Sequence, residues 1–455
     1  MKAKFVASIL VMFFITSQPS IGINSFFFKT KKGDYATFVK SDSFVWASKF
    51  KIVEIGASDT EAPQKIIAGL KKKGVRPVFY DWAPTGYYHK EEDINNAFIR
   101  WVYKNRTSVS LNPNGPFPMC AAENGTCEDY YFDFGNEKVV FKKADFINRF
   151  AQENGYGGVF FDWASGTFIN EPEYKEMKGN FSKRHPKSSY IRSIGNFYRL
   201  MKDKNITIIT NQGFRNAENV LPFTDYDMTE SYGTGTAYTG KTLYVKGIGR
   251  TEVPQTVYFP VSEDYRKGSL KDTIYYLNYL RDLREKYKNG SLKNFIYMNY
   301  AAPIFVPCGN GMFETAEPKN AIFYNYALAK LCNFVCYTEV PFDHALERDN
   351  VYFYDLGKPL GKSYQKINGG YVRYYENGFV VLGNWQKKTK IVLHSQNIKS
   401  YSPLYDLFEK KWIRPSGYFS ASITISPEKD ELTGKFAPAG RVFLYPFFKT
   451  PFSGK

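Results

Sequence analysis

The sequence has few of the residues that hold metal ions or carry out thiol chemistry. Four of its 455 residues are histidines, and they stand singly along the chain. The five cysteines show no spacing to one another or to a histidine that fits a zinc site. A histidine-centred triad or metal centre is therefore disfavoured, and we expect neither a metal ion nor another cofactor.

Beyond its N-terminus the sequence lacks an apolar run of membrane length. The run from Phe5 to Ile15 follows two lysines and precedes small and polar residues that end at Gly22. It is too short for a spanning helix, and the layout is typical of a secretory signal peptide over residues 1–22. We therefore expect an exported protein, extracellular, periplasmic or at the cell surface, without a stable membrane span.

The cysteine positions leave room for disulfides in such a compartment. Cys120 and Cys127 flank a short loop, whereas Cys308, Cys332 and Cys336 lie close together in sequence. One or two bridges and a leftover thiol would fit the odd count, with the pairing left open.

The net charge of +17 is spread over many lysines and arginines. It indicates a solvated basic surface or attraction to an acidic polymer or cell surface. No basic run is long enough for a nucleic-acid-binding tail. We expect no nucleic-acid partner, and we expect a monomer.

Short apolar runs alternate with segments of helical period over most of the chain. Strands are predicted at 35–40, 50–56, 76–82, 157–163, 206–211, 225–232, 255–261 and 294–300, with 107–112 as a substitute for the first. Helices are expected between them, as at 269–290, where Ser269 and Asp272 have capping-box spacing. This pattern predicts an α/β protein, a (β/α)8 TIM barrel over residues 23–345. A doubly wound open sheet is the alternative.

The last part of the chain has a different pattern. Runs at 371–393, 421–426 and 440–447 are separated by turn residues, and Asn377-Gly378 is a strong hairpin signal. Residues 346–455 are therefore predicted to form a small antiparallel, sandwich-like accessory β domain.

Polar residues end several of the predicted parallel strands, where barrel enzymes carry their reactive groups. Carboxylates and aromatic faces at one mouth suit a sugar site, because the acids act on the glycosidic bond and the rings stack on pyranose faces. The candidate residues are Asp81, Trp82, Asp162, Trp163, Asn211, Glu230 and Tyr232.

Each candidate also has a structural interpretation. A carboxylate that ends a strand can cap the next helix or meet a lysine, and the three aromatic residues can belong to the core. Strand alternation groups Glu230 with Tyr226 and Met228 rather than with Asp225 and Asp227.

Three segments carry a resemblance to known enzymes. "GYGGVFFDWASG" resembles a strand of barrel glycosidases, and "ITIITNQGFRNAENVLPFTDYDMTESY" resembles its continuation in glycoside hydrolase family 114, the endo-α-1,4-polygalactosaminidases. "PVFYDWAPTGYY" is similar to the barrel group named hypothetical glycosyl hydrolase family fifteen. The resemblance implies that Asp162 is the nucleophile or base and Glu230 the proton donor. The chain departs from it at Gly158, where many relatives carry aspartate.

We therefore expect an exported glycoside hydrolase that cleaves a polysaccharide or oligosaccharide. Asp162 and Glu230 would form the carboxylate pair, Asp81 and Asn211 would hold sugar hydroxyls, and Trp82, Trp163 and Tyr232 would line the subsites. The alternative is a noncatalytic carbohydrate-binding or cell-surface protein on a degenerate barrel. In the enzyme, the two carboxylates should face one cleft within about 10 Å.

One nucleotide-binding pattern is also present, from Gly235 to Gly240, Lys241 and Thr242. A phosphate loop requires a full helix after it, whereas the segment that follows contains two glycines and a proline. We therefore expect no nucleotide there, and instead a flexible polar rim of the sugar cleft.

Overall fold

The structure is a computed structural model. It describes residues 52–58, 62, 64–88, 97–114, 128–259, 268–340, 351, 354–396, 398, 402–429 and 436–446, and the two-residue strand β1 (Phe13–Phe14). The rest of the predicted signal peptide, the predicted strand 35–40, Cys120 and Cys127 lie outside the described residues.

The backbone folds into two compact units. Unit 1 comprises Met1–Phe13, Phe28–Met228 and Asp282–Phe295. Unit 2 comprises Phe14–Phe27, Thr229–Arg281 and Ile296–Lys455. The predicted boundary between residues 345 and 346 stays a prediction.

The main sheet has the strand order β1-β2-β3-β6-β7-β8-β11-β14, which follows the chain. The recorded pairings β2–β3, β3–β6, β6–β7, β7–β8 and β11–β14 are all parallel. A doubly wound sheet would reverse its order at a switch point, so this alternative is wrong. With the antiparallel C-terminal sheets, the order confirms the predicted (β/α)8 barrel followed by a β domain. The strands are β2 (Ile52–Ala57), β3 (Arg76–Trp82), β6 (Gly158–Asp162), β7 (Thr207–Asn211), β8 (Tyr226–Glu230), β11 (Asn294–Tyr300) and β14 (Val335–Glu339).

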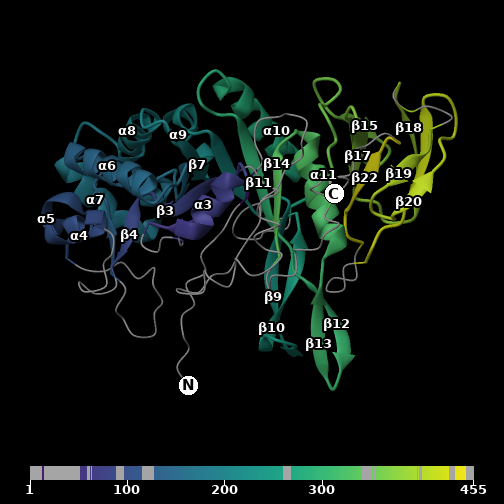
Figure 1. Ribbon diagram of the computed structural model, residues 1–455, viewed down its shortest axis with the longest axis horizontal. Helices are drawn as coiled ribbons and strands as arrows, with labels where there is room; N and C mark the ends of the chain where they lie inside the picture. The colour runs from purple at the N-terminus through teal and green to yellow at the C-terminus, as the bar shows by residue number, and fades with distance from the viewer. Residues whose placement is uncertain are drawn as a thin grey trace. The chain divides into compact units, whose positions relative to one another are not determined.

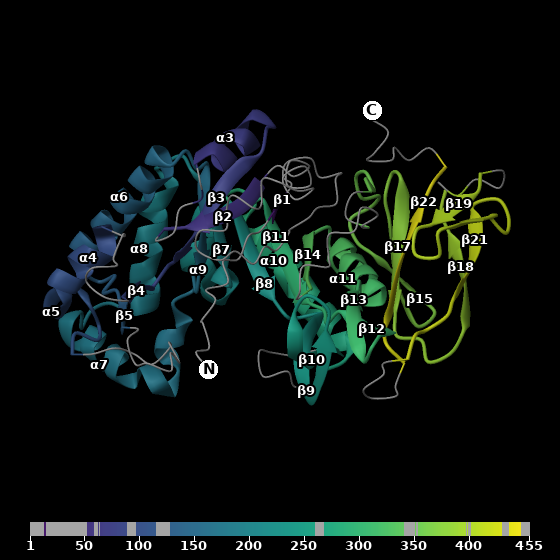
Figure 2. The same ribbon diagram turned by 60° about the horizontal axis from the view of Figure 1, so that its bottom comes forward.

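Helices separate these strands, and their ends follow local sequence signals. Asn136 caps α6 by accepting a hydrogen bond from the Lys138 amide at 3.0 Å. The predicted capping box is present at α10, where Ser269 and Asp272 exchange bonds of 2.8 and 3.3 Å. In unit 1, α6 and α8 lie side by side (Figures 1 and 2). The helices are α3 (Gln64–Lys72), α4 (Ala97–Lys104), α5 (Arg106–Val109), α6 (Glu137–Glu153), α7 (Lys175–Arg184), α8 (Tyr190–Lys202), α9 (Ala217–Val220), α10 (Leu270–Tyr287) and α11 (Lys319–Leu331).

Two strand predictions are corrected by the structure. The run 255–261 was expected in the barrel, but β10 (Gly249–Tyr258) pairs antiparallel with β9 (Thr234–Val245). The parallel strand β14 was not predicted. Burial distinguishes a strand of the parallel sheet from β10: β7 is buried along its whole length, whereas β10 carries exposed residues. The substitute strand at 107–112 is also wrong, since α5 covers Arg106–Val109.

Two hairpins form a separate four-stranded sheet in unit 2. Its order is β10-β9-β13-β12, with β12 (Ile304–Gly309) and β13 (Met312–Ala316) as the second hairpin (Figure 2). The phosphate-loop match lies on β9, paired with β10, so the expectation that no helix follows it is confirmed. The prediction that this segment forms a flexible loop at the rim of a cleft is wrong, because the segment is a paired strand.

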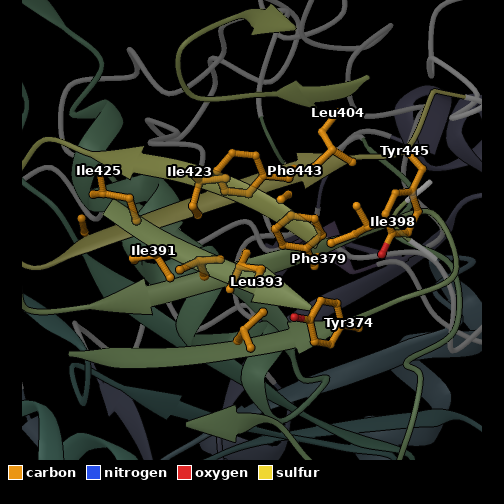
Figure 3. Close-up of a cluster of buried hydrophobic side chains, with 14 of the residues drawn as sticks. Tyr374, Phe379, Ile391, Leu393, Ile398, Leu404, Ile423, Ile425, Phe443 and Tyr445 are labelled. Atoms are coloured by element: carbon orange, nitrogen blue, oxygen red, sulfur yellow. The ribbon is translucent and has the colours of Figure 1, made fainter. Parts of the chain in front are cut away.

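The C-terminal β domain has a six-stranded sheet, β15-β16-β17-β22-β19-β20, and a two-stranded sheet, β18-β21. Its strands surround one cluster of buried side chains that includes Phe379, Ile391 and Phe443 (Figure 3). The predicted hairpin at Asn377-Gly378 joins β16 to β17. The strands are β15 (Gln365–Ile367), β16 (Gly370–Tyr374), β17 (Gly378–Gly383), β18 (Thr389–His394), β19 (Leu404–Asp406), β20 (Lys411–Ile413), β21 (Ser420–Ile425) and β22 (Ala439–Leu444).

Helix α11 approaches this domain closely within unit 2. A side-chain carbon on Gly440 of β22 would lie 2.3 Å from the carbonyl oxygen of Phe323, so only glycine allows this approach. Tyr375 also donates a 2.5 Å hydrogen bond to the carbonyl of Lys330. A helix of the barrel therefore shares its core with the C-terminal domain.

Candidate active site

The strand register of unit 1 sorts the polar residues onto two faces. Trp82 pairs with Asp162, and Phe160 pairs with Ile209, two residues before Asn211. Because side chains alternate along a strand, Trp82, Asp162 and Asn211 share one face, called the site face here. Figure 1 labels β3 and β7 of this sheet.

The opposite face is called the helix face. Asp81 pairs with Phe161 there, and Thr210 pairs with Asp227. The Phe161 ring lies 5.7 Å from that of Tyr198 on α8, which shows that this face looks toward the helices. Asp81 and Asp227 are therefore turned away from the site face.

Asp162 ends β6 and is held by hydrogen bonds at both carboxylate oxygens. Tyr80 donates to Oδ2 at 2.5 Å, and Asn211 donates to Oδ1 at 2.8 Å. The backbone N–H of Trp163 also donates to Oδ1 at 2.8 Å. Three donors hold this carboxylate in one orientation. Asp162 is half-buried, so the oriented carboxylate is still partly open to solvent.

Trp163 takes a left-handed backbone conformation with φ of 54°. This region is uncommon for a residue other than glycine, and here it directs the Trp163 amide at Asp162. The Trp163 ring lies 5.7 Å from that of Trp82, tilted by 58°. Both rings are half-buried. The two tryptophans therefore lie beside Asp162, and their role as stacking surfaces for sugar stays a prediction.

Asn211 ends β7 and is 4% exposed. Its side-chain N–H donates to Asp162, so in the structure it orients this carboxylate. Gln212, which follows it, also has a left-handed backbone with φ of 56°. The predicted contact of Asn211 with sugar hydroxyls stays a prediction.

Asp81 lies on the helix face in a buried ion pair. Lys143 of α6 meets its Oδ2 at 2.8 Å, and Ser58 donates to its Oδ1 at 2.7 Å. Lys143 also donates to the backbone carbonyl of Trp82 at 2.7 Å. Burial lowers the pKa of Lys143, and the Asp81 charge opposes this effect. Contact with a lysine was the structural interpretation of Asp81, and the structure shows this contact. Contact of Asp81 with a sugar stays a prediction.

Sequence reasoning missed Tyr80 and Lys143. Tyr80 is two residues before Trp82, so alternation already placed it on the same face. Lys143 stands among buried positions of α6, and a lysine within an apolar stripe is a signal of a buried charged partner.

Glu230 lies in unit 2, at the end of β8, and is half-buried. Tyr300, at the end of β11, donates to its Oε1 at 3.0 Å. Ser231 is left-handed with φ of 61°, and its N–H donates to the Met298 carbonyl at 3.1 Å. Like Asp162, Glu230 is followed by a left-handed residue and accepts a bond from a tyrosine hydroxyl. Its pairing with Asp162 stays a prediction.

The chain after Glu230 is fixed by a buried asparagine. Asn299 Oδ1 accepts hydrogen bonds from the amides of Gly233 and Thr234 at 2.7 and 3.0 Å. Tyr232, which precedes Gly233, stacks on Tyr276 of α10, with ring centroids 3.7 Å apart and planes 10° from parallel. One face of Tyr232 is thus covered by another ring, and its role in a subsite stays a prediction.

Within the part of the chain that the structure describes, no group of three or more His, Cys, Asp or Glu side chains is arranged to hold a metal ion. Cys308 is an exposed free thiol, and Cys332 and Cys336 are buried free thiols. None of the helices among the described residues is both long and apolar enough to cross a membrane.

No protein-family model matches the chain, and no curated protein matches it. The fold is similar to solved glycoside hydrolase structures. The glycoside hydrolase domain of PelA from Pseudomonas aeruginosa is 13% identical, with a TM-score of 0.38, over 66% of this chain and 90% of that one. Ega3 from Aspergillus fumigatus, in complex with galactosamine, is 11% identical, with a TM-score of 0.31, over 66% and 81%.

A maltogenic α-amylase, AmyB from Thermotoga neapolitana, is 10% identical, with a TM-score of 0.46, over 91% of this chain and 96% of that one. At such identities the similarity concerns the fold, and a function has to be argued from the side chains of the site.

Proposed function

We propose that the protein is a glycoside hydrolase that cleaves O-glycosidic bonds in a polysaccharide or oligosaccharide. The observation that carries this proposal is the setting of Asp162 at the carboxyl end of β6. Its carboxylate is oriented by Tyr80, Asn211 and the Trp163 amide, and two tryptophan rings lie beside it. Reactive groups of barrel enzymes occupy this end of the strands.

In the proposed reaction Asp162 acts as an anion. It attacks the anomeric carbon in a retaining mechanism, or takes a proton from water in an inverting one. Its three donors support either role, because they stabilise the negative charge before substrate arrives. They also restrict rotation of the carboxylate, so that the reacting oxygen is held in one direction.

Glu230 is proposed as the acid that protonates the leaving oxygen, in line with the sequence resemblance. Strand alternation gives it the face of Met228, which is paired with Asn211. The hydrogen bond from Tyr300 orients the Glu230 carboxyl group.

The remaining candidates are proposed to bind the sugar chain. Trp82, Trp163 and Tyr232 would present ring faces or edges to pyranose rings, and Asn211 would contact a hydroxyl from its place beside Asp162. Asp81 is the exception, because it lies on the helix face: it would support the site indirectly by holding Lys143, which donates to the Trp82 carbonyl. We further propose that residues 1–22 direct export, that the C-terminal domain is an accessory domain, and that the protein is a monomer.

Hydrolysis of a polysaccharide panel tests the proposal. The panel should include acidic and amino-sugar polymers beside neutral glucans, because the protein carries a net charge of +17. On a substrate that is cleaved, Asp162→Asn and Glu230→Gln should each lower turnover by several orders of magnitude. Asp145→Asn and Glu153→Gln, which alter exposed carboxylates of α6, serve as matched controls.

Folding of each variant is checked by circular dichroism. Near-wild-type turnover in the Asp162 or Glu230 variant would reject the role assigned to that residue. Binding of a glycan without release of reducing ends would instead support the noncatalytic alternative.

A further inference from the structure

Asp227, the aspartate of β8, has several hydrogen-bond partners and no place in the proposed chemistry. It lies on the helix face and is completely buried. Its Oδ1 accepts from the Thr210 hydroxyl at 2.6 Å and from the Gly213 amide at 2.8 Å. Its Oδ2 accepts from the Phe214 amide at 2.8 Å. A carboxylate on β8 therefore holds the chain at the end of β7 at three points.

These three contacts lie on both sides of Asn211 in the sequence. Thr210 immediately precedes Asn211, and Gly213 and Phe214 begin the short helix that follows it, Gly213–Asn216. Between them, Gln212 has a left-handed backbone, and its N–H donates to the Met228 carbonyl at 2.8 Å. The turn is thus fixed by β8 on both sides of Asn211.

Close approach adds to this restraint. A side-chain carbon on Gly213 would lie 2.7 Å from Asp227 Oδ1 and 2.7 Å from Val220. Such a distance is shorter than carbon and oxygen atoms tolerate, so glycine is required for the turn to reach the carboxylate.

We infer that Asp227 is a positioning residue, which fixes the turn after β7 so that Asn211 donates to Asp162. The inference rests on the proposed function of Asp162. The chain of contacts runs from Asp227 through Thr210 and Gly213 to the backbone of Asn211, and from the Asn211 side chain to Asp162 Oδ1. Asp227 itself lies on the opposite sheet face and does not touch the substrate.

An aspartate suits this position better than an asparagine. In the ionised aspartate both oxygens accept hydrogen bonds, whereas an asparagine has one oxygen and would point an N–H₂ group at one of the two backbone amides. A buried amide without an acceptor costs about 1–3 kcal/mol. The turn in an asparagine variant should relax away from β8 to recover a partner for that amide.

Crystal structures of Asp227→Asn, Gly213→Ala and Asp225→Asn test this inference. In the first two variants the separation of Asn211 Nδ2 and Asp162 Oδ1, 2.8 Å in the native protein, should exceed about 3.5 Å. Gly213→Ala keeps the carboxylate and displaces the turn by bulk, so it decides the question if Asp227→Asn does not fold.

Asp225→Asn is the matched control. Asp225 also accepts from a backbone amide of β7, that of Ile208 at 2.9 Å, and it pairs with Lys293, but it does not contact the turn. The contact between Asn211 and Asp162 should persist in this variant. If it also persists in folded Asp227→Asn, the inference is overturned.

Kinetics separate this inference from the proposed function. On a glycan that the wild type cleaves, Asp227→Asn should lower kcat about a hundredfold, as expected for a small misplacement of a reacting group, with KM within about twofold. A wild type that cleaves no glycan would reject the proposed function, whereas the distance in the crystal would still decide the role of Asp227.

Discussion

The two faces of the parallel sheet in unit 1 use the same residue type in different ways. On the site face, Asp162 is half-buried and accepts from a phenol, an amide side chain and one backbone N–H. On the helix face, Asp81 is neutralised by Lys143, and Asp227 is surrounded by a hydroxyl and backbone amides. One step along a strand therefore separates a half-buried carboxylate from a buried one that is fully used in support.

Removing the cation from the helix face should have the largest effect on stability. Lys143→Met leaves Asp81 buried without its ion-pair partner, and loss of one member of a buried pair costs about 3–5 kcal/mol. Urea unfolding would measure this loss in the free energy of unfolding. The adjacent, exposed Lys142→Met is the control. A loss below about 1 kcal/mol in Lys143→Met would show that the pair is not needed for stability.

Asp227 should make stability depend on pH in a defined direction. Burial raises the pKa of Asp227 from 3.8 to about 7, against the opposing hydrogen bonds from Thr210, Phe214 and Gly213. Between these pKa values, Asp227 holds a proton in the folded state that it releases in the unfolded state. Its contribution to the free energy of unfolding is therefore full below pH 4 and is lost as the pH rises toward 7. A pKa difference of about three units corresponds to at most about 4 kcal/mol in the free energy of unfolding.

Urea unfolding of the wild type and of Asp227→Asn between pH 4 and pH 7.5 isolates this contribution. The difference in unfolding free energy between the two proteins should change with pH in that range, with the wild type losing more stability as pH rises. Parallel curves would show that Asp227 does not titrate there.

The smallest of these effects concerns the site face. Tyr80→Phe removes the donor to Asp162 Oδ2, and a hydrogen bond to a charged group contributes about 1.5–3 kcal/mol. On a substrate that the wild type cleaves, turnover should fall roughly ten- to hundredfold. Tyr156→Phe is the control, because the Tyr156 hydroxyl accepts from the Ala62 amide, away from Asp162. Turnover of Tyr80→Phe within about twofold of wild type would contradict the proposed support of Asp162.

Much of the barrel could be predicted from the sequence because its strands are continuous apolar runs. β3 has the predicted bounds, and β6 and β7 lie within one residue of theirs. The run at 255–261 was predicted as a strand but was assigned to the wrong sheet, because residue preferences identify a strand and not the sheet that it joins. β14 was missed although it lies within the residues 23–345 that were assigned to the barrel; three residues separate its five residues from the end of α11.

The candidate site was predictable to a different degree. Polar residues at strand ends singled out Asp162, and alternation along β8 groups Glu230 with Met228. The partners were harder to predict, because Tyr80 and Lys143 meet Asp162 and Asp81 from positions 82 and 62 residues away. The register of β3 and β6 brings Tyr80 to Asp162, and the packing of α6 on the sheet brings Lys143 to Asp81. A single sequence contains neither.

The left-handed residues at three strand ends have a consequence for how this chain tolerates change. Trp163, Gln212 and Ser231 directly follow Asp162, Asn211 and Glu230. A branched side chain such as valine or isoleucine is poorly accommodated in that conformation. Variation at these positions is thus restricted by backbone handedness, independently of what their side chains contact. A library that diversifies the residues next to the carboxylates should therefore favour glycine, asparagine and aspartate at 163, 212 and 231, and leave β-branched residues out.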